Sequence, residues 1–302
     1  MGQPARGRID VHHHVLPPQF SARTPSPVPF PEIEARLEGM DGLGIQVAMT
    51  SLTPRVFLGY PDDPRGVARA CNEYQAGLME QAPGRFGAFA VLPLPDVDGA
   101  LGEVAYALDV LRLDGVGLFS STGHRYPGHP ELDPLLEELH RRRAAVFIHP
   151  AHCTTPPEWG INAFDGIIEY GFDTTRCIVN LVQSGAFERY PGIRFIFSHG
   201  GGAAPYLARR IESHYSGATA LLQAQYYDNA SLMGAHALRT LQAFVPADQI
   251  LWGTDIPFIH GDRLGGQIAE WEAYDGLSAA EREGVEFGNA RTLFPRLGAP
   301  VG

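Results

Sequence analysis

Near its start the 302-residue chain reads RIDVHHHVLPP, residues 8–18. The first residues of this run are typical of a short buried strand, and three histidines follow at once. Side chains alternate between the two faces of a strand, so His12 and His14 share one face and His13 points to the other. A purification tag is a longer run in a featureless linker. Two imidazoles on one face can bind one metal ion, so the pattern predicts further ligands elsewhere in the chain.

The rest of the chain alternates strand-like and helix-like segments. The expected strands are residues 8–12, 45–51, 86–92, 115–120, 145–149, 194–198, about 225–229 and 249–254. Amphipathic segments lie between them, such as residues 32–42, 64–82, 97–112, 132–143 and 202–214. Strands that alternate with helices pair in parallel, and eight such units predict a closed (β/α)₈ TIM barrel of the α/β class. We expect one such domain over residues 1–302, because these barrels commonly exceed about 200 residues.

Two loops interrupt this alternation. Residues 17–31, PPQFSARTPSPVPFP, contain six prolines and predict a rigid, extended loop after the first strand. Residues 151–164, AHCTTPPEWGINAF, predict a long inserted loop after the fifth strand, whose Trp159 and Phe164 are available to line a pocket.

Composition excludes several classes of function. The net charge of −11 and the absence of a basic block argue against nucleic-acid binding. No apolar run reaches the length of about 18 residues that crosses a membrane. Three widely spaced cysteines, Cys71, Cys153 and Cys177, fit reduced thiols in the cytoplasm. All 23 basic residues are arginines, which excludes a Schiff-base lysine, a phosphate-binding lysine and a lysine-derived metal bridge.

Four of the expected strands end in a histidine or a carboxylate. These residues are His12 and His14 after the first strand, His149 after the fifth, His199 after the sixth and Asp255 after the eighth. Catalytic groups of (β/α)₈ barrels lie at the carboxyl ends of the strands, so the barrel would bring these five together. Any one histidine alone is more often structural, and Asp255 before Ile-Pro could cap a turn. Their coincidence at four strand ends favours a metal site.

Imidazole and carboxylate ligands suit one divalent ion, with Zn²⁺ the first choice and Mn²⁺ or Fe²⁺ as alternatives. One position would stay open for water or substrate. His13 is expected to pack or hydrogen-bond on the opposite face of its strand. The other histidines are expected in loops (His124, His129, His152, His260) or on helix surfaces (His140, His214, His236).

These motifs resemble the amidohydrolase superfamily. The matching motifs are D-x-H-x-H at residues 10–14, H-P at 149–150, S-H-G-G-G at 198–202 and G-T-D-x-P-F at 253–258. The chain is similar to the decarboxylase branch that includes aminocarboxymuconate-semialdehyde and gamma-resorcylate decarboxylases. Residues 9–18, 115–126 and 172–202 look most like 6-methylsalicylate decarboxylases. The resemblance extends to GNARTLFPRL, residues 288–297.

The resemblance implies a site with one metal ion, whose ligands would be His12, His14, His149 and Asp255. It implies His199 as an acid or base beside the metal-bound water. It also implies two substrate arginines, Arg36 and Arg210, the second reaching the substrate of a neighbouring subunit in a homodimer or larger homo-oligomer. Either arginine could instead be a helix-surface ion-pair residue. The gamma-resorcylate enzymes have a glutamate where His12 stands, which puts the transfer of their metal site in doubt.

The activity implied is metal-dependent, non-oxidative decarboxylation of a small ortho-hydroxy aromatic acid, of the salicylate or 6-methylsalicylate type. A metal would chelate the carboxylate and the phenolate together. Asp255 would deliver a proton to the carboxyl-bearing carbon, and His199 would tune the protonation of Asp255. Phe57, Trp159 and Phe258 are candidate ring contacts, whereas Phe119 and Trp252 fit core packing better.

Two other functions remain open. The same residues could hydrolyse a lactone or an amide, with Asp255 as the base for a metal-bound hydroxide. The H-G-G-G context and the missing lysine favour decarboxylation. A non-catalytic ligand-binding barrel would keep the fold without turnover, but the intact set of ligands argues against it.

Overall fold

The computed structural model describes residues 7–26, 28–123, 125–151, 153–154, 156–161 and 164–298. Eight parallel strands form one sheet in chain order, each hydrogen-bonded to the next. The strands are β1 Arg8–His14, β2 Ile45–Ser51, β3 Phe86–Val91, β4 Gly115–Phe119, β5 Ala145–His149, β6 Arg194–Phe197, β7 Tyr226–Asp228 and β8 Ile250–Leu251. The chain after β8 closes the ring, because Val11 donates its N–H to the carbonyl of Trp252 (3.0 Å) and Asp255 donates to that of His12 (2.8 Å). The predicted (β/α)₈ barrel is confirmed.

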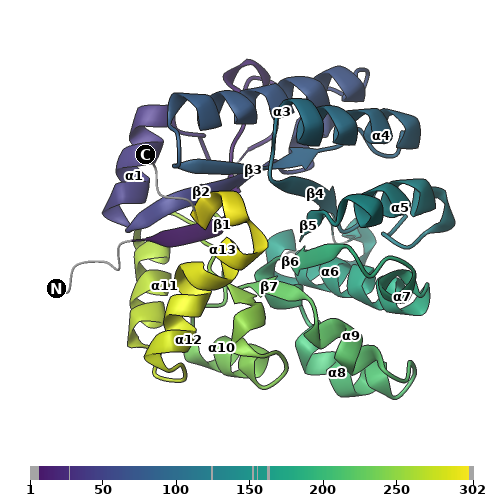
Figure 1. The fold of residues 1–302 in the computed structure, drawn as a ribbon, viewed down its shortest axis with the longest axis vertical. Helices are drawn as coiled ribbons and strands as arrows, with labels where there is room; N and C mark the ends of the chain where they lie inside the picture. Colours follow the sequence, from purple (N-terminus) through teal and green to yellow (C-terminus); the bar gives the residue numbers. More distant parts are fainter. Residues whose placement is uncertain are drawn as a thin grey trace.

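Helices surround the ring of strands (Figure 1). The longer ones are α1 Ile33–Gly42, α3 Pro64–Gln81, α4 Val97–Ala105, α5 Asp133–Arg142, α6 Asp165–Gln183, α8 Ala204–Glu212, α10 Ala235–Gln242 and α11 Gly261–Ala273. Shorter helices are α2 Arg55–Gly59, α7 Ala186–Arg189, α9 Ala218–Gln223, α12 Ala279–Glu283 and α13 Asn289–Leu293. Within the described part of the chain, no helix combines the length and the apolar character needed to cross a membrane.

Local chemistry explains where several helices begin. Asp63 precedes α3 and accepts the N–H of Gly66, and Pro64 occupies the first turn, where its missing N–H costs nothing. Asp96 caps α4 in the same way by accepting the N–H of Gly99. These caps satisfy backbone donors that the helix itself leaves unpaired.

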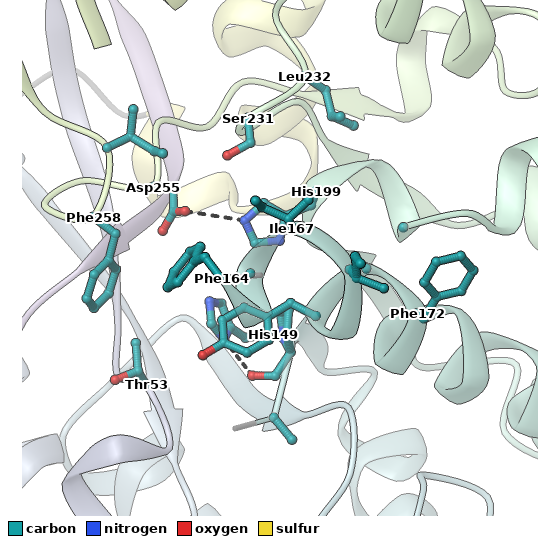
Figure 2. Close-up of a pocket in the computed structure, with 18 of the residues that line it drawn as sticks. Thr53, His149, Phe164, Ile167, Phe172, His199, Ser231, Leu232, Asp255 and Phe258 are labelled. Carbon is teal, nitrogen blue, oxygen red and sulfur yellow. Dashed lines mark hydrogen bonds and ion pairs between the residues drawn. The ribbon is translucent and has the colours of Figure 1, made fainter. Parts of the chain in front are cut away.

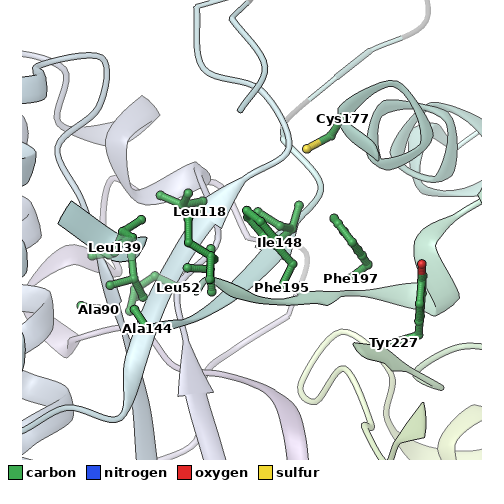
Figure 3. Packing of buried hydrophobic residues seen from close by; sticks show 14 of the residues in the cluster. Leu52, Ala90, Leu118, Leu139, Ala144, Ile148, Cys177, Phe195, Phe197 and Tyr227 are labelled. Atoms are coloured by element: carbon green, nitrogen blue, oxygen red, sulfur yellow. The ribbon is translucent and has the colours of Figure 1, made fainter. Parts of the chain in front are cut away.

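Two apolar clusters stabilise the barrel. One lies between the strands and the helices, and Figure 3 shows part of it, with Leu118, Ile148 and Phe197 from the strands and Cys177 from α6. The other fills the interior, where Phe89 stacks on Phe147 with ring centroids 5.0 Å apart and also contacts Phe294. The segment around α13 therefore closes the amino end of the barrel, and the carboxyl ends of the strands remain available for a site.

The structure departs from the sequence expectation mainly at the end of β8. The expected strand over residues 249–254 shortens to Ile250–Leu251. Trp252 donates its N–H to the carbonyl of Val285, and the two N–H groups after it donate to side chains, that of Gly253 to Asn229 and that of Thr254 to Asp10. Side-chain acceptors thus replace the ladder, and this turns the chain towards Asp255.

The long helix α6 was not among the amphipathic segments named as examples from the sequence, although the eight-unit pattern implies a helix at this place. Its first turns carry large apolar residues that are exposed in the structure, among them Ile167 and Phe172. Such residues obscure the amphipathic pattern from which a helix is predicted. His124 and His152, both expected in loops, lie outside the described residues.

Candidate active site

Four buried side chains converge at the carboxyl end of the barrel. His12 and His14 come from β1, His149 ends β5, and Asp255 follows β8. One ligand atom from each of them lies within 4.8 Å of the others. The Nε2 atoms of His12 and His14 are 3.1 Å apart, and Asp255 Oδ1 is 3.5 Å from the first and 3.2 Å from the second. The structure therefore brings together the four proposed metal ligands.

The outer nitrogen of each imidazole has a partner that fixes the tautomer. His149 Nδ1 faces the carbonyl of Pro150 at 2.9 Å, and a carbonyl only accepts, so this Nδ1 carries the proton. His14 Nδ1 lies 3.1 Å from Ser51 Oγ, whose own proton points to the carbonyl of His13. The inner Nε2 atoms of both rings are then unprotonated lone pairs.

The outer nitrogen of His12 also has a partner, and here the partner is a carboxylate. Its Nδ1 lies 2.8 Å from Asp228 Oδ2, and both groups are fully buried. With Nδ1 of each ring directed to its outer partner, three inner imidazole nitrogens and the carboxylate of Asp255 face one another. Such a donor set repels itself unless a cation lies at its centre, and it suits a divalent ion bound by nitrogen and oxygen.

The pKa values describe the same groups without a metal ion. Burial, together with the neighbouring histidines, lowers the pKa of His14 to about 4 and holds that of His149 well below its usual value. Burial opposes the charged form of His12, but Asp228 and Asp255 outweigh it and raise the pKa to about 9. Burial would raise the pKa of Asp255, yet the surrounding histidines hold it well below its usual range. In the absence of a metal ion, protons supply the positive charge that this cluster needs.

Asp228, which the sequence analysis did not single out, ties two parts of the site together. Oδ2 accepts from His12, while Oδ1 accepts the backbone N–H groups of His199 (2.8 Å) and Ala230 (3.1 Å). Its position at the end of β7 was the available signal, but the sequence placed that strand only approximately, at about residues 225–229. A carboxylate on the far nitrogen of a ligating histidine orients the ring and increases its basicity.

We expect Asp228→Asn to weaken metal binding about 10- to 100-fold, because both carboxylate oxygens accept hydrogen bonds and an amide has one acceptor oxygen. Competition of the purified protein with a fluorescent chelator would measure this. Asp248→Asn removes a carboxylate from the exposed connection before β8 and serves as the matched control. Equal affinities in the two variants would remove Asp228 from the metal site.

His199 lies beside the cluster rather than in it. Its Nε2 is 3.4 Å from Asp255 Oδ2, the oxygen that points away from His12 and His14. Among the residues that the structure describes, its Nδ1 has no hydrogen-bond partner. Asp255 therefore connects the cluster to His199, and His199 faces the open space above (Figure 2).

The opposite face of β1 carries a separate network. His13 is buried, with Nδ1 3.0 Å from Asp10 and Nε2 2.9 Å from a guanidinium nitrogen of Arg36. Arg36 also donates to the carbonyl of His14. The hydrogen-bonding role expected for His13 is confirmed. Arg36, proposed as a substrate contact, is held in this network and is not among the described residues that line the cavity.

A cavity of about 500 Å³ opens above the cluster, with His149, His199 and Asp255 at its base. Its walls combine apolar side chains, such as Ile167 and Phe172 of α6 and Leu232, with polar ones such as Thr53 (Figure 2). A pocket of this size and mixed lining is typical of small-molecule sites.

Of the other proposed substrate residues, one lines the cavity and three do not. Phe258 lines the cavity and contacts the His14 ring at a centroid distance of 5.2 Å. Phe57 packs against the core and Phe119, and it is not among the described residues that line the cavity. Trp159 is 62% exposed on the inserted loop, and Arg210 is exposed on α8. Neither of these two is among the described lining residues.

Several lining residues went unrecognised in the sequence, notably Ile167, Phe172, Ser231, Leu232 and Arg55. The loop after β5 that borders them is anchored by Asp173 of α6. This carboxylate accepts from Ser120, whose Oγ in turn accepts the N–H of Ala151 at 2.7 Å. Such contacts between distant segments leave no local sequence signal.

Backbone strain concentrates at this cavity. His199 (φ 50°), Ser231 (φ 60°) and Asp255 (φ 64°) are non-glycine residues with left-handed backbones, and all three line it. Such conformations cost about 1–3 kcal/mol each and persist where the surrounding structure holds them, often at functional sites.

Comparisons with known proteins point to one family. The amidohydrolase family profile matches residues 9–296. The chain is 33% identical to Decarboxylase macB of Penicillium terrestre, over 96% of this chain and 95% of that protein. It is 32% identical to a 6-methylsalicylic acid decarboxylase of Penicillium expansum, over 96% and 97%. A dihydroxybenzoic acid decarboxylase from Polaromonas sp. JS666, crystallised with manganese and 2-nitroresorcinol, shares the fold with a TM-score of 0.79 at 22% identity, over 98% of each chain. The chain therefore belongs to the amidohydrolase family.

Proposed function

We propose that this protein is a metal-dependent, non-oxidative decarboxylase of a small ortho-hydroxy aromatic acid, of the salicylate or 6-methylsalicylate type. The observation that carries the proposal is the convergence of three imidazole side chains and the Asp255 carboxylate under an open cavity, with His199 beside them. Relatives named as decarboxylases, which align over nearly the whole chain, support the reaction class.

His12, His14, His149 and Asp255 would hold one divalent ion, Zn²⁺ in the first place, with Mn²⁺ as the alternative. The manganese in the Polaromonas structure supports the alternative. When bound, such an ion orients and polarises two substrate oxygens at once. Of the ring hydroxyls, only one ortho to the carboxylate would be close enough for one ion to polarise the hydroxyl and the carboxylate together.

Asp255 and His199 then handle the protons. Loss of CO₂ from a benzoate leaves an electron pair on a ring carbon, so that carbon must first receive a proton. Asp255 is ionised in the resting site, since its pKa is held low, and takes the phenolic proton as the substrate binds. It returns this proton to the carboxyl-bearing carbon. The carbon–carbon bond then breaks, its electrons restore the aromatic ring, and His199 passes a solvent proton to the product phenolate.

The substrate requirement follows from this mechanism. We expect the metal-loaded protein to decarboxylate salicylate and 6-methylsalicylate, whereas 3-hydroxybenzoate and benzoate remain at the uncatalysed rate. Moving the hydroxyl to the meta position removes both the second metal contact and the electron donation to the reacting carbon. In D₂O, deuterium should appear at the vacated ring carbon, because the Asp255 proton exchanges with solvent. Mass spectrometry of the phenol product measures both results.

Three outcomes would contradict the proposal. Benzoate turning over as fast as salicylate would exclude the double contact. A product without deuterium would exclude protonation from an exchangeable group. Hydrolysis of a lactone or amide panel, with no CO₂ from any acid, would assign the site to the alternative hydrolase activity.

We further propose a homodimer or larger homo-oligomer, with a small aromatic acid as the ligand and no nucleic-acid or membrane partner. Tyr206 on α8 is 82% exposed, and Phe164 and Ile167 beside the cavity are exposed as well. An apolar surface of this kind, next to the exposed Arg210, supports contact with a second copy. The three free cysteines support a reducing compartment, the cytoplasm, and residues 1–302 are proposed to act as a single domain.

A further inference from the structure

Arg55 places a positive charge on the wall of the cavity. It begins the short helix α2 directly after Thr53 and Pro54, and its side chain is partly buried. It lines the same cavity as His149 and Asp255.

Tight packing fixes α2 and therefore Arg55. Gly59 at the end of α2 approaches the proline-rich loop so closely that a Cβ there would lie 2.5 Å from the carbonyl oxygen of Arg23. The Arg55 guanidinium then bridges two walls, since it donates to the carbonyl of Pro25 (3.4 Å) and to the Tyr170 hydroxyl on α6 (3.2 Å). These two bonds hold the group in place and leave most of its N–H donors for a ligand.

The Arg55 guanidinium has no ion-pair partner among the residues that the structure describes. The other candidate arginines are less suited to bind a ligand in the cavity. Arg36 is engaged on the far face of β1, Arg210 lies off the cavity, and Arg263 lines its mouth but is exposed to screening solvent.

An anionic ligand needs such a group here. The protein carries a net charge of −11, which opposes the approach of an acid. A local cation in a cleft compensates by raising the potential where the ligand enters.

We propose that Arg55 binds an anionic oxygen of the substrate and makes the cavity selective for acids over neutral molecules of the same shape. The inference rests on the proposed function, in that the substrate is an aromatic acid. A guanidinium suits this task, because its planar fork can donate two parallel hydrogen bonds to one carboxylate.

Salicylate and salicylamide separate charge from shape, since both carry the ring and the ortho-hydroxyl but only the first is an anion. Isothermal titration of the metal-loaded protein should show that Arg55→Gln weakens salicylate binding about 10- to 100-fold, as loss of a charge-assisted hydrogen bond does. Salicylamide binding should change less than about twofold. Arg239→Gln removes the same charge from an exposed position on α10 and is the matched control. Arg55→Lys keeps the charge but loses the fork, so it should fall between wild type and Arg55→Gln.

If Arg55→Gln lowers the affinity for salicylate and salicylamide equally, Arg55 only shapes the cavity wall. If the affinity for salicylate is unchanged, another group binds the anionic oxygen. Either result overturns the inference. If Arg55→Gln does not fold, Arg55→Lys decides on the same two ligands. If wild type binds salicylate through Arg55 but releases no CO₂, the proposed decarboxylation fails and the role of Arg55 stands.

Discussion

Replacing His149 with alanine is expected to remove the bound metal and the catalytic activity together. His149 contributes one of four converging donor atoms, and within the described part of the chain its one other hydrogen bond is with the adjacent carbonyl of Pro150. The substitution therefore deletes a ligand with little other damage. We expect metal content well below one ion per chain by elemental analysis and no measurable CO₂ release. A bound ion at a hundredfold excess over its Kd stabilises the wild-type protein by about 2.7 kcal/mol, which raises its Tm. We expect His149→Ala to lose this increase in Tm.

His13→Ala is the informative control, because His13 belongs to the same histidine triplet but faces the other way. It should retain metal and lose stability, since Asp10 and Arg36 each lose a buried partner at a cost of about 1–3 kcal/mol. His12→Ala should lose metal as His149→Ala does, although it also leaves the buried Asp228 without its histidine. Full metal occupancy and normal rates in His149→Ala would end the assignment of this cluster as the metal site.

The contrast between His12 and His13 shows what the sequence could predict. Strand alternation alone assigns their faces, and strand-end positions alone gather His149, His199 and Asp255, because a parallel barrel aligns all its carboxyl ends. The predictions succeeded where a local period or a topological rule determines the position.

Asp228 and Arg55 show where prediction stopped. Asp228 acts through contacts with His12 and with the backbone of His199, which are far away in the sequence. Arg55 lines the cavity because Gly59 lets α2 pack against the proline-rich loop. No sequence pattern predicts this close contact. Arg36 illustrates the converse, since its place in a family-like motif suggested substrate binding, while its side chain is held by His13.

His199→Ala is expected to keep the metal and lose about 10²- to 10⁴-fold in kcat, the usual contribution of a general acid or base. The two oxygens of Asp255 explain the separation. Oδ1 lies against His12 and His14, whereas Oδ2 lies against His199, so removal of His199 leaves the ligand contacts intact and interrupts proton transfer. Metal analysis and CO₂ release on one preparation would measure both properties.

A second substitution separates chemistry from strain. His199 has a left-handed backbone (φ 50°), which alanine tolerates poorly and asparagine adopts more readily. If backbone strain caused the loss of kcat in His199→Ala, His199→Asn would recover most of the rate. If loss of proton transfer causes it, both variants remain slow. His236→Ala, on the exposed surface of α10, controls for loss of any histidine. Because Asp255 would still deliver the first proton, both variants should still place solvent deuterium on the ring, and the loss should fall on the later protonation of the product phenolate. Unchanged turnover in His199→Ala would leave Asp255 and water as the only proton carriers.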